Sequence, residues 1–193
     1  MGQDKALLSL HGETLIERAL KTLRLLSGPP PQIAAPRPDL AAYAPILPDL
    51  HPNCGPLSGI EAALAATTHP LNLFLPVDLP LLPAPFLRCL IHRAQTTGAL
   101  VTIPRLNGRP QPLCAIYHRV LLPSISQSLQ TGNYKVLPAV LTAASQFPQS
   151  IDLFDTESLV SINPTLSQHP PHRWFLNCNT PSDLAMIGLL LTP

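Results

Sequence analysis

Charged residues are scarce in this chain of 193 residues. Asp, Glu, Lys and Arg make up 12% of it, against roughly 25% in an average domain, and the net charge is +1. No cluster of lysine and arginine lies near the few aromatic residues, so the electrostatic attraction on which nucleic-acid affinity depends is missing. This composition argues against a nucleic-acid-binding protein. A surface with little charge also leads us to expect either a monomer of limited solubility or a homo-oligomer.

Cysteine pairs and long apolar runs are scarce as well. The cysteines Cys54, Cys89, Cys114 and Cys178 form no C-x-x-C motif, and no signal-like apolar stretch opens the chain. The longest apolar runs, such as Ile187–Leu191, fall far short of the ~20 residues that span a bilayer. We therefore expect a reduced, cytoplasmic protein without a membrane segment.

Two common catalytic motifs are absent: the phosphate loop G-x-x-x-x-G-K-[ST] and the nucleophile elbow G-x-S-x-G. The apolar content of 46% excludes a disordered chain, and the 25 prolines are scattered between periodic segments. A chain of this length suits one domain with a substantial core. We predict a single domain over residues 1–193.

Strands and helices are expected to alternate along the chain. Strands are predicted at 32–35, 46–47, 74–78, 99–103, 111–117 and 174–181, with one or two edge strands in 149–163. Helices are predicted at 15–26, 60–67, 84–97, 121–130, 135–144 and 182–191, the first of them opened by a capping box of Thr14 and Glu17. Strands 99–103 and 111–117 should form a hairpin-like excursion. This alternation predicts an α/β fold with a doubly wound, mainly parallel sheet.

One carboxylate stands out in the apolar stretch Phe74–Pro83, where Asp78 lies between prolines. A run this apolar predicts a buried strand, and Pro80 and Pro83 should end it near Asp78. Ligands of open α/β sheets bind at the carboxyl ends of strands. An ionised carboxylate at that position suits Mg²⁺ that is shared with substrate phosphates. The alternative is an aspartate that only caps a turn or the next helix.

A loop rich in turn-forming residues, Asn53–Gly59, precedes the helix predicted at 60–67. Its two glycines and Ser58 could let a ligand approach the backbone, and free N–H groups at a helix start favour anions. A plain loop-to-helix junction explains the same residues equally well.

Four elements occur in an order and spacing that resemble the nucleotidyltransferase family typified by the molybdenum cofactor guanylyltransferases. They are Asp4-Lys5, Asp49 with the following Asn53–Gly59, Leu75–Pro80, and Phe175–Leu184, which is similar to that family's N-x-N-T-P-x-D-L sequence. The resemblance implies a Rossmann-like fold of the nucleotide-diphospho-sugar transferase type. It also implies a Mg²⁺-dependent transfer of GMP from GTP to molybdenum-molybdopterin, with release of pyrophosphate.

The resemblance also implies roles for individual residues. Lys5 matches the lysine of M-G-x-D-K that reaches the nucleotide phosphates, where an ammonium would offset their charge. Asp78 matches the acid that holds Mg²⁺. Asp49 falls near the guanosine, and its carboxylate can accept hydrogen bonds from the N–H groups of guanine. Lys5 and Asp78 are therefore the expected catalytic residues, and the nucleotide is expected to contact all three.

On the molybdopterin side, the resemblance implies contacts from Asn177 and Asn179, whose carboxamides can both donate and accept hydrogen bonds. Lys135 falls where an arginine is often found in the family. It keeps the positive charge but loses the bidentate geometry of a guanidinium. Transient contact with molybdoenzymes is a further implication of the family.

Glycine is scarce where this family needs it most. The family begins with a strand and a loop, L-A-G-G-x-S-x-R-M-G, whose N–H groups cradle the nucleotide phosphates. Only Met1 and Gly2 of that element are present. The other residues, roughly 10–20, should form the first strand of the sheet. We expect that an internal methionine stands at the start of the sequence, because Lys5 and Asp78 persist; the alternative is a product that lacks the loop and binds nucleotide poorly.

Two rival functions remain open at this stage. A cytidylyltransferase or a sugar-phosphate nucleotidyltransferase would use the same fold, and the preference for guanine or cytosine would separate them. A non-catalytic homologue would bind molybdopterin or a partner protein without turning over GTP. The incomplete glycine loop is the feature that favours the second rival.

Overall fold

The computed structural model describes residues 4–148, 150–162, 166 and 170–191, so Met1 and Gly2 lie outside it. Its α-helices are α1 (Leu15–Arg24), α2 (Pro56–Ala66), α3 (Ala84–Thr97), α4 (Leu122–Gln130), α5 (Val136–Ala144), α6 (Thr156–Ile162), α7 (Pro171–Trp174) and α8 (Pro181–Leu191). Its strands are β1 (Ser9–Leu10), β2 (Glu13–Thr14), β3 (Ile33–Ala34), β4 (Ile46–Leu47), β5 (Leu71–Phe74), β6 (Val101–Leu106), β7 (Arg109–Pro110), β8 (Ala115–His118) and β9 (Ile151–Asp155).

The largest sheet has the order β5-β8-β6-β7, with β9 also paired to β6. Strands β5, β6 and β9 run in one direction, because β8 is antiparallel to both β5 and β6 while β9 is parallel to β6. Strand β8 is therefore the return strand of the predicted hairpin-like excursion, inserted between two strands of common direction. A separate parallel pair joins β3 to β4. The predicted α/β class, with its main strands in one direction, is confirmed.

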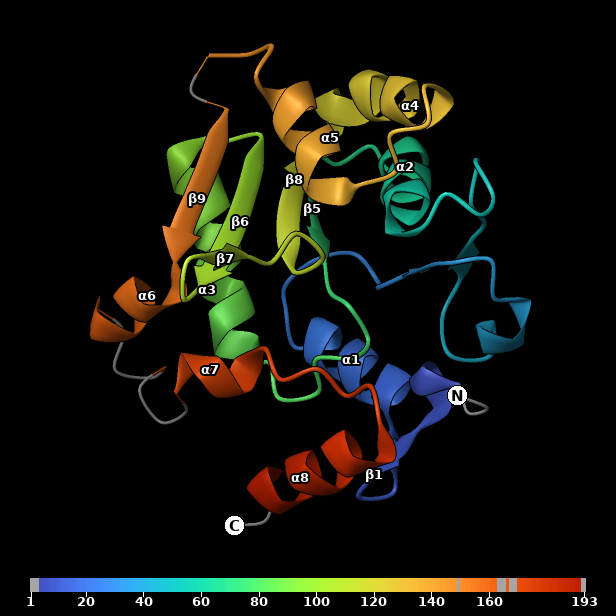
Figure 1. Ribbon diagram of the computed structural model, residues 1–193, viewed down its shortest axis with the longest axis vertical. Coiled ribbons are helices and arrows are strands. Elements are labelled where there is room, and N and C mark those ends of the chain that lie inside the picture. Colours follow the sequence, from blue (N-terminus) through green and yellow to red (C-terminus); the bar gives the residue numbers. More distant parts are fainter. Residues whose placement is uncertain (1–3, 149, 163–165, 167–169, 192–193) are drawn as a thin grey trace.

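Helices cover both faces of this sheet, as predicted for a doubly wound fold (Figure 1). On one face, apolar residues of α2, α4 and α5 pack against Val101, Ile103 and Tyr117. On the other face, α3 packs against Ile116, with α6 and α7 beside it. The ring of Phe86 in α3 lies 5.0 Å from that of Trp174 in α7, and both are fully buried. Alternate residues of β8 thus point to opposite cores.

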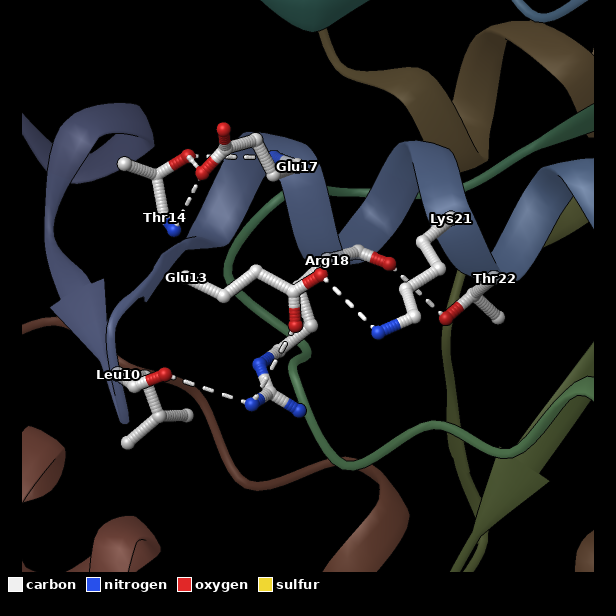
Figure 2. Close-up of polar contacts among 7 residues, drawn as sticks. All are labelled: Leu10, Glu13, Thr14, Glu17, Arg18, Lys21 and Thr22. Carbon is white, nitrogen blue, oxygen red and sulfur yellow. Dashed lines mark hydrogen bonds and ion pairs between the residues drawn. The ribbon is translucent and has the colours of Figure 1, made fainter.

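The amino-terminal part of the described chain is a short hairpin, β1-β2, that leads directly into α1 (Figure 2). The predicted capping box is confirmed: the Glu17 N–H donates to Thr14 Oγ1, and the Thr14 N–H donates to the Glu17 carboxylate at 2.8 Å. Glu13 pairs with Arg18 at 3.6 Å and with Lys21 at 3.4 Å. These contacts join the hairpin to α1, although ion pairs near the surface contribute only about 0–1 kcal/mol each.

The strand that carries Asp78 is shorter and starts earlier than predicted. Strand β5 ends at Phe74, which pairs with Ala115, and Asp78 lies in a turn four residues further on. The physical reason is Pro76, which has no N–H to donate to the ladder and keeps the residue before it out of regular pairing. Because β8 is its only partner among the described strands, β5 is half-buried instead of buried.

Two other strand predictions differ from the structure. No strand forms over 174–180 in the structure; the short helix α7 ends at Trp174 and an irregular segment follows it. The stretch 149–163 holds one strand, β9, and then the helix α6. Helix α2 also starts at Pro56, four residues earlier than predicted, since proline is well placed at the first turn of a helix. Helices α3 and α5 agree with the prediction within one residue, and α3 ends at Gly98 in a left-handed conformation.

Candidate functional site

The turn that follows β5 places Asp78 beside the carboxy-terminal segment. The N–H of Cys178 donates to the backbone carbonyl of Asp78 at 2.9 Å. This bond joins two sequence elements that lie 100 residues apart, so that the D-x-P turn and the N-x-N-T-P segment form one region. Asp78 therefore lies beyond the carboxyl end of a strand, as predicted, even though the strand itself ends earlier.

Lys5 enters the same region from the start of the chain. Its ammonium donates a hydrogen bond to Oδ1 of Asn179 at 2.6 Å, across 174 residues of sequence. Burial raises the pKa of the Asp78 carboxyl, and the nearby positive charge of Lys5 offsets part of that increase. Lys5, Asp78 and Asn179 are thus brought together by the fold. We call these three residues the phosphate corner.

Asn179 is held in place by the start of α8. The N–H groups of Asn179 and Thr180 both donate to Oδ2 of Asp183, at 3.0 and 2.8 Å, and the Asp183 N–H donates to Thr180 Oγ1 at 3.1 Å. These hydrogen bonds lower the pKa of the Asp183 carboxyl. Asp183 received no role of its own in the sequence prediction, although it is the aspartate of the N-x-N-T-P-x-D-L match. Its signal was present, because T-x-x-D before an apolar run is a capping box of the same kind as Thr14 and Glu17.

Asn177 occupies a different environment from Asn179. It is exposed, whereas Asn179 is half-buried and Cys178 between them is fully buried. The prediction that both asparagines share one face of a strand is wrong in its structural basis. The segment pairs with no described strand, and its N–H groups donate instead to the Asp78 carbonyl and the Asp183 carboxylate. A role for Asn177 toward a substrate stays a prediction.

An ion-pair cluster that the sequence did not suggest anchors the segment before Lys5. Asp4 accepts from the N–H of Ala6 at 3.0 Å, which caps the short 3₁₀ turn Lys5–Leu7, and it also pairs with the Arg37 guanidinium. Arg37 donates from Nε to Asp39 at 2.8 Å as well. The Arg37 hydrogen bonds lower the pKa of both carboxyls. The cluster ties the lysine segment to the loop between β3 and β4.

Asp49 lies in a second region, just after β4. One of its carboxylate oxygens, Oδ1, is buried and has no hydrogen-bond partner among the described residues. Burial raises the pKa of the Asp49 carboxyl, and the negative charge of Glu61 raises it further. A buried oxygen without a donor is costly to leave unsatisfied, so this position favours a ligand that brings N–H groups.

The structure requires glycine at two positions near the start of α2, for different reasons. Gly55 precedes α2 with a φ of 71°, a conformation that glycine adopts without strain. A Cβ at Gly59 would lie 2.8 Å from the carbonyl oxygen of Ala34, so the absence of a side chain there lets α2 pack closely on β3. The close approach to the backbone that was expected of a ligand is made, at Gly59, by strand β3.

Lys135 is not brought to the two asparagines in the described structure. It precedes α5 as an exposed residue, and α5 and α8 lie at opposite ends of the molecule in Figure 1. Its neighbour Tyr134 interacts with Cys54, and the hydrogen bond between them raises the pKa of the tyrosine. Lys135 thus follows a residue that contacts the loop after Asp49. Its expected contact with molybdopterin stays a prediction.

The donor set around Asp78 fits a magnesium ion only in combination with a phosphate ligand. Among the residues that the structure describes, no group of three or more His, Cys, Asp or Glu could hold a metal. Proteins commonly hold Mg²⁺ through one or two carboxylates while substrate phosphates and water supply the other oxygens. Asp78, half-buried and close to a lysine that suits phosphate, matches that arrangement.

The helices of the described chain are short or amphipathic. None of them is both long enough and apolar enough to cross a bilayer.

Comparisons with known proteins show a similarity to nucleotide transferases. Residues 1–146 match the family described as MobA-like NTP transferase domain. A relative from Deinococcus radiodurans, called probable molybdenum cofactor guanylyltransferase, is 31% identical over 192 residues, which cover 97% of this chain and 86% of that protein.

Two solved structures show the same fold. Molybdopterin-guanine dinucleotide biosynthesis protein A from Archaeoglobus fulgidus has a TM-score of 0.75 and 22% identity, with 98% of this chain and 91% of that chain covered. The 2-C-methyl-D-erythritol 4-phosphate cytidylyltransferase of Thermus thermophilus has a TM-score of 0.62 and 19% identity, with 98% and 94% covered. The expected fold type, that of the nucleotidyltransferases, is therefore confirmed. With more than half of its length matched, the chain belongs to the MobA-like NTP transferase family.

Proposed function

We propose that this protein transfers GMP from GTP to molybdenum-molybdopterin and releases pyrophosphate, in the biosynthesis of the molybdenum cofactor. The observation that carries the proposal is the hydrogen bond between Lys5 and Asn179 beside the half-buried Asp78. It brings together three elements that the sequence matched to the guanylyltransferases one by one. Relatives over nearly the whole chain carry the guanylyltransferase name, which supports the same activity.

In this proposal the phosphate corner handles the triphosphate. The Lys5 ammonium offsets the negative charge that grows on the phosphate oxygens as pyrophosphate leaves. The ionised Asp78 carboxylate accepts only, and it would hold Mg²⁺ together with phosphate oxygens. A bound magnesium ion would supply further charge stabilisation at those oxygens. Asp78 must be ionised for this role, and the positive charge of Lys5 favours its ionised form.

Other residues of the protein contact the guanine base and the molybdopterin acceptor. Asp49 accepts from N–H groups of the guanine base, which satisfies its buried, unpartnered oxygen. Asn179 bonds to Lys5 and so lies next to the phosphate where an acceptor must attack in line; Asn177 and Lys135 are the further residues proposed for the molybdopterin. The cytoplasm remains the proposed location, because the reaction consumes GTP.

The direct test measures binding and turnover of the full chain. Thermal unfolding with GTP or CTP, each with and without Mg²⁺, should show stabilisation by GTP with Mg²⁺, since a ligand that binds only the folded state raises the melting temperature. Pyrophosphate release should then require molybdopterin as acceptor.

Other outcomes would overturn the proposal in different ways. Stabilisation and pyrophosphate release with CTP alone would assign a cytidylyltransferase. If neither nucleotide stabilises the protein and no pyrophosphate is released, the protein is a binding homologue without nucleotidyltransferase activity.

A further inference from the structure

Three hydrogen bonds of His51 hold the loop that carries Asp49 to helix α2. We call residues 49–55 the base loop. The His51 N–H donates to Ser58 Oγ at 3.3 Å, and Ser58 Oγ donates to the His51 carbonyl at 2.7 Å. The third contact is between His51 Nδ1 and Glu61 Oε2 at 2.7 Å. Both backbone groups and the side chain of His51 are therefore engaged by α2, two residues after Asp49.

The partners of His51 are unusual for a helix that packs in the core. Ser58 has no exposed surface, and Glu61 is 1% exposed. Its neighbours Leu57, Ile60 and Leu64 on α2 are buried among apolar side chains. A buried carboxylate costs stability unless it is paired, and an apolar residue in its place is often more stable. Packing alone therefore does not account for Glu61 at this position.

Glu61 also affects the carboxylate of Asp49, which lies two residues before its partner His51. Its negative charge adds to the burial that disfavours the ionised form of Asp49. An ionised Glu61 carboxylate only accepts, so its hydrogen bond to His51 requires the imidazole tautomer that is protonated at Nδ1. That hydrogen bond offsets part of the Glu61 charge. It also fixes the imidazole, and with it the backbone that leads back to Asp49.

We propose that His51, Ser58 and Glu61 are positioning residues for the nucleotide base, which hold the base loop so that the buried Asp49 Oδ1 faces donors on the ligand. The inference rests on the proposed function, because it concerns the same nucleotide site. The matching ligand is a purine with adjacent N–H donors. Guanine presents N1–H and the 2-amino group on one edge, whereas cytosine presents an acceptor next to its amino group.

The test uses the full chain with His51→Ala, Ser58→Ala and Glu61→Gln. The probes are GTP, ITP and CTP with Mg²⁺. ITP lacks only the 2-amino group of guanine, so the ratio of GTP to ITP affinity reports the contact to that group. A control variant, Ser128→Ala, removes a serine hydroxyl that donates to a helix carbonyl at 3.1 Å in α4, remote in sequence from the base loop.

We expect His51→Ala and Ser58→Ala to weaken GTP binding roughly tenfold, the effect of losing one or two hydrogen bonds that involve charged or buried groups. The KM for GTP should rise while kcat at saturating GTP stays near that of the parent chain. The ratio of GTP to ITP affinity should fall toward one. Glu61→Gln keeps an oxygen that accepts from His51 and should retain most of the affinity. Ser128→Ala should change none of these values.

Three results would overturn the inference, and they are distinguishable. If the parent chain binds GTP and prefers it to ITP, but His51→Ala and Ser58→Ala keep both the affinity and the preference, the positioning role is wrong and the proposed function stands. A lower melting temperature with an unchanged GTP to ITP ratio also refutes the positioning role, because it shows a purely structural one. If the parent chain binds no nucleotide, the proposed function fails and the inference with it.

Discussion

Two regions of the molecule contain a carboxyl whose pKa is raised by burial, and they differ in the charges around it. Beside Asp78 lies Lys5, whose positive charge offsets the effect of burial. Near Asp49 lies Glu61, whose negative charge adds to it. The same residue type, with its pKa raised by burial in both regions, is thereby suited to different ligands. A carboxylate next to an ammonium suits a metal and phosphates, whereas one next to a second carboxylate favours neutral N–H donors.

The two regions also differ in how the chain builds them. The Lys5–Asn179 contact joins residues 174 apart, while the contacts of His51 reach residues only seven and ten positions away. The phosphate corner therefore depends on the docking of α8 and on the carboxy-terminal segment. The His51 anchor of the base loop depends on one helix, α2, although Cys54 in the same loop also contacts the distant Tyr134. Mutations of distant residues should therefore affect the phosphate corner, whereas the His51 anchor should respond to mutations in α2.

The largest effect is expected from Asp78→Asn, which removes the carboxylate of the phosphate corner. Turnover, measured as pyrophosphate release, should fall about 10²–10³-fold, because the amide cannot take part in Mg²⁺ binding as a carboxylate does. The nucleotide-free protein should at the same time become more stable at pH 7. Burial raises the pKa of Asp78 above 3.8, so its ionised form opposes folding.

The pH dependence checks the sign of that stability difference. The folded state holds the Asp78 proton more tightly than the unfolded state, so the advantage of Asp78→Asn is largest above the folded pKa and disappears as the pH falls below 3.8. Thermal unfolding at several pH values measures it. Asp155→Asn, at an exposed ion pair with Arg105, is the control and should leave turnover unchanged. A turnover within twofold of the parent chain would remove Asp78 from the catalytic residues.

An intermediate effect is expected from Lys5→Met, which keeps the length of the side chain but removes its charge. The catalytic efficiency kcat/KM should fall roughly 10–100-fold through the loss of one charge-assisted interaction with phosphate. The hydrogen bond to Asn179 is lost too, so the KM for molybdopterin should rise. Lys21→Met, at an exposed lysine 3.4 Å from Glu13, is the matched control. Equal activities for the two variants would separate Lys5 from the phosphate corner.

The smallest effect is expected from Arg37→Gln, which loosens the anchor of the lysine segment. Arg37 joins the half-buried Asp4 to the exposed Asp39 near the surface, where ion pairs contribute at most about 1 kcal/mol, so kcat should fall no more than roughly fivefold. The difference should shrink at high salt, which screens such pairs. Arg24→Gln, where the guanidinium donates to the Tyr43 carbonyl at 3.2 Å, is the control. If both variants respond equally to salt, the Arg37 cluster does not position Lys5.

Local patterns in the sequence were sufficient wherever a structure depends on neighbours along the chain. The capping box of Thr14 and Glu17 is confirmed, as are helix α3 and its end at Gly98. Each is decided by propensity, capping and apolar spacing over a few residues. The strand expected around Asp78 was displaced because apolar content alone does not show which backbone N–H groups have a partner. The segment 174–180 was misassigned for the same reason, since its hydrogen bonds go to Asp78 and Asp183.

The sequence by itself determined the α/β class, the family resemblance and the residue types at the candidate site: a lysine, two aspartates and two asparagines. Only the tertiary structure decided which of them meet. It brought Lys5 to Asn179, left Asn177 exposed, and placed Lys135 away from both asparagines. It also revealed Asp183, Arg37 and the contacts of His51, because these residues act by holding others. Their roles come from hydrogen bonds and burial across the fold, which no spacing along the chain encodes.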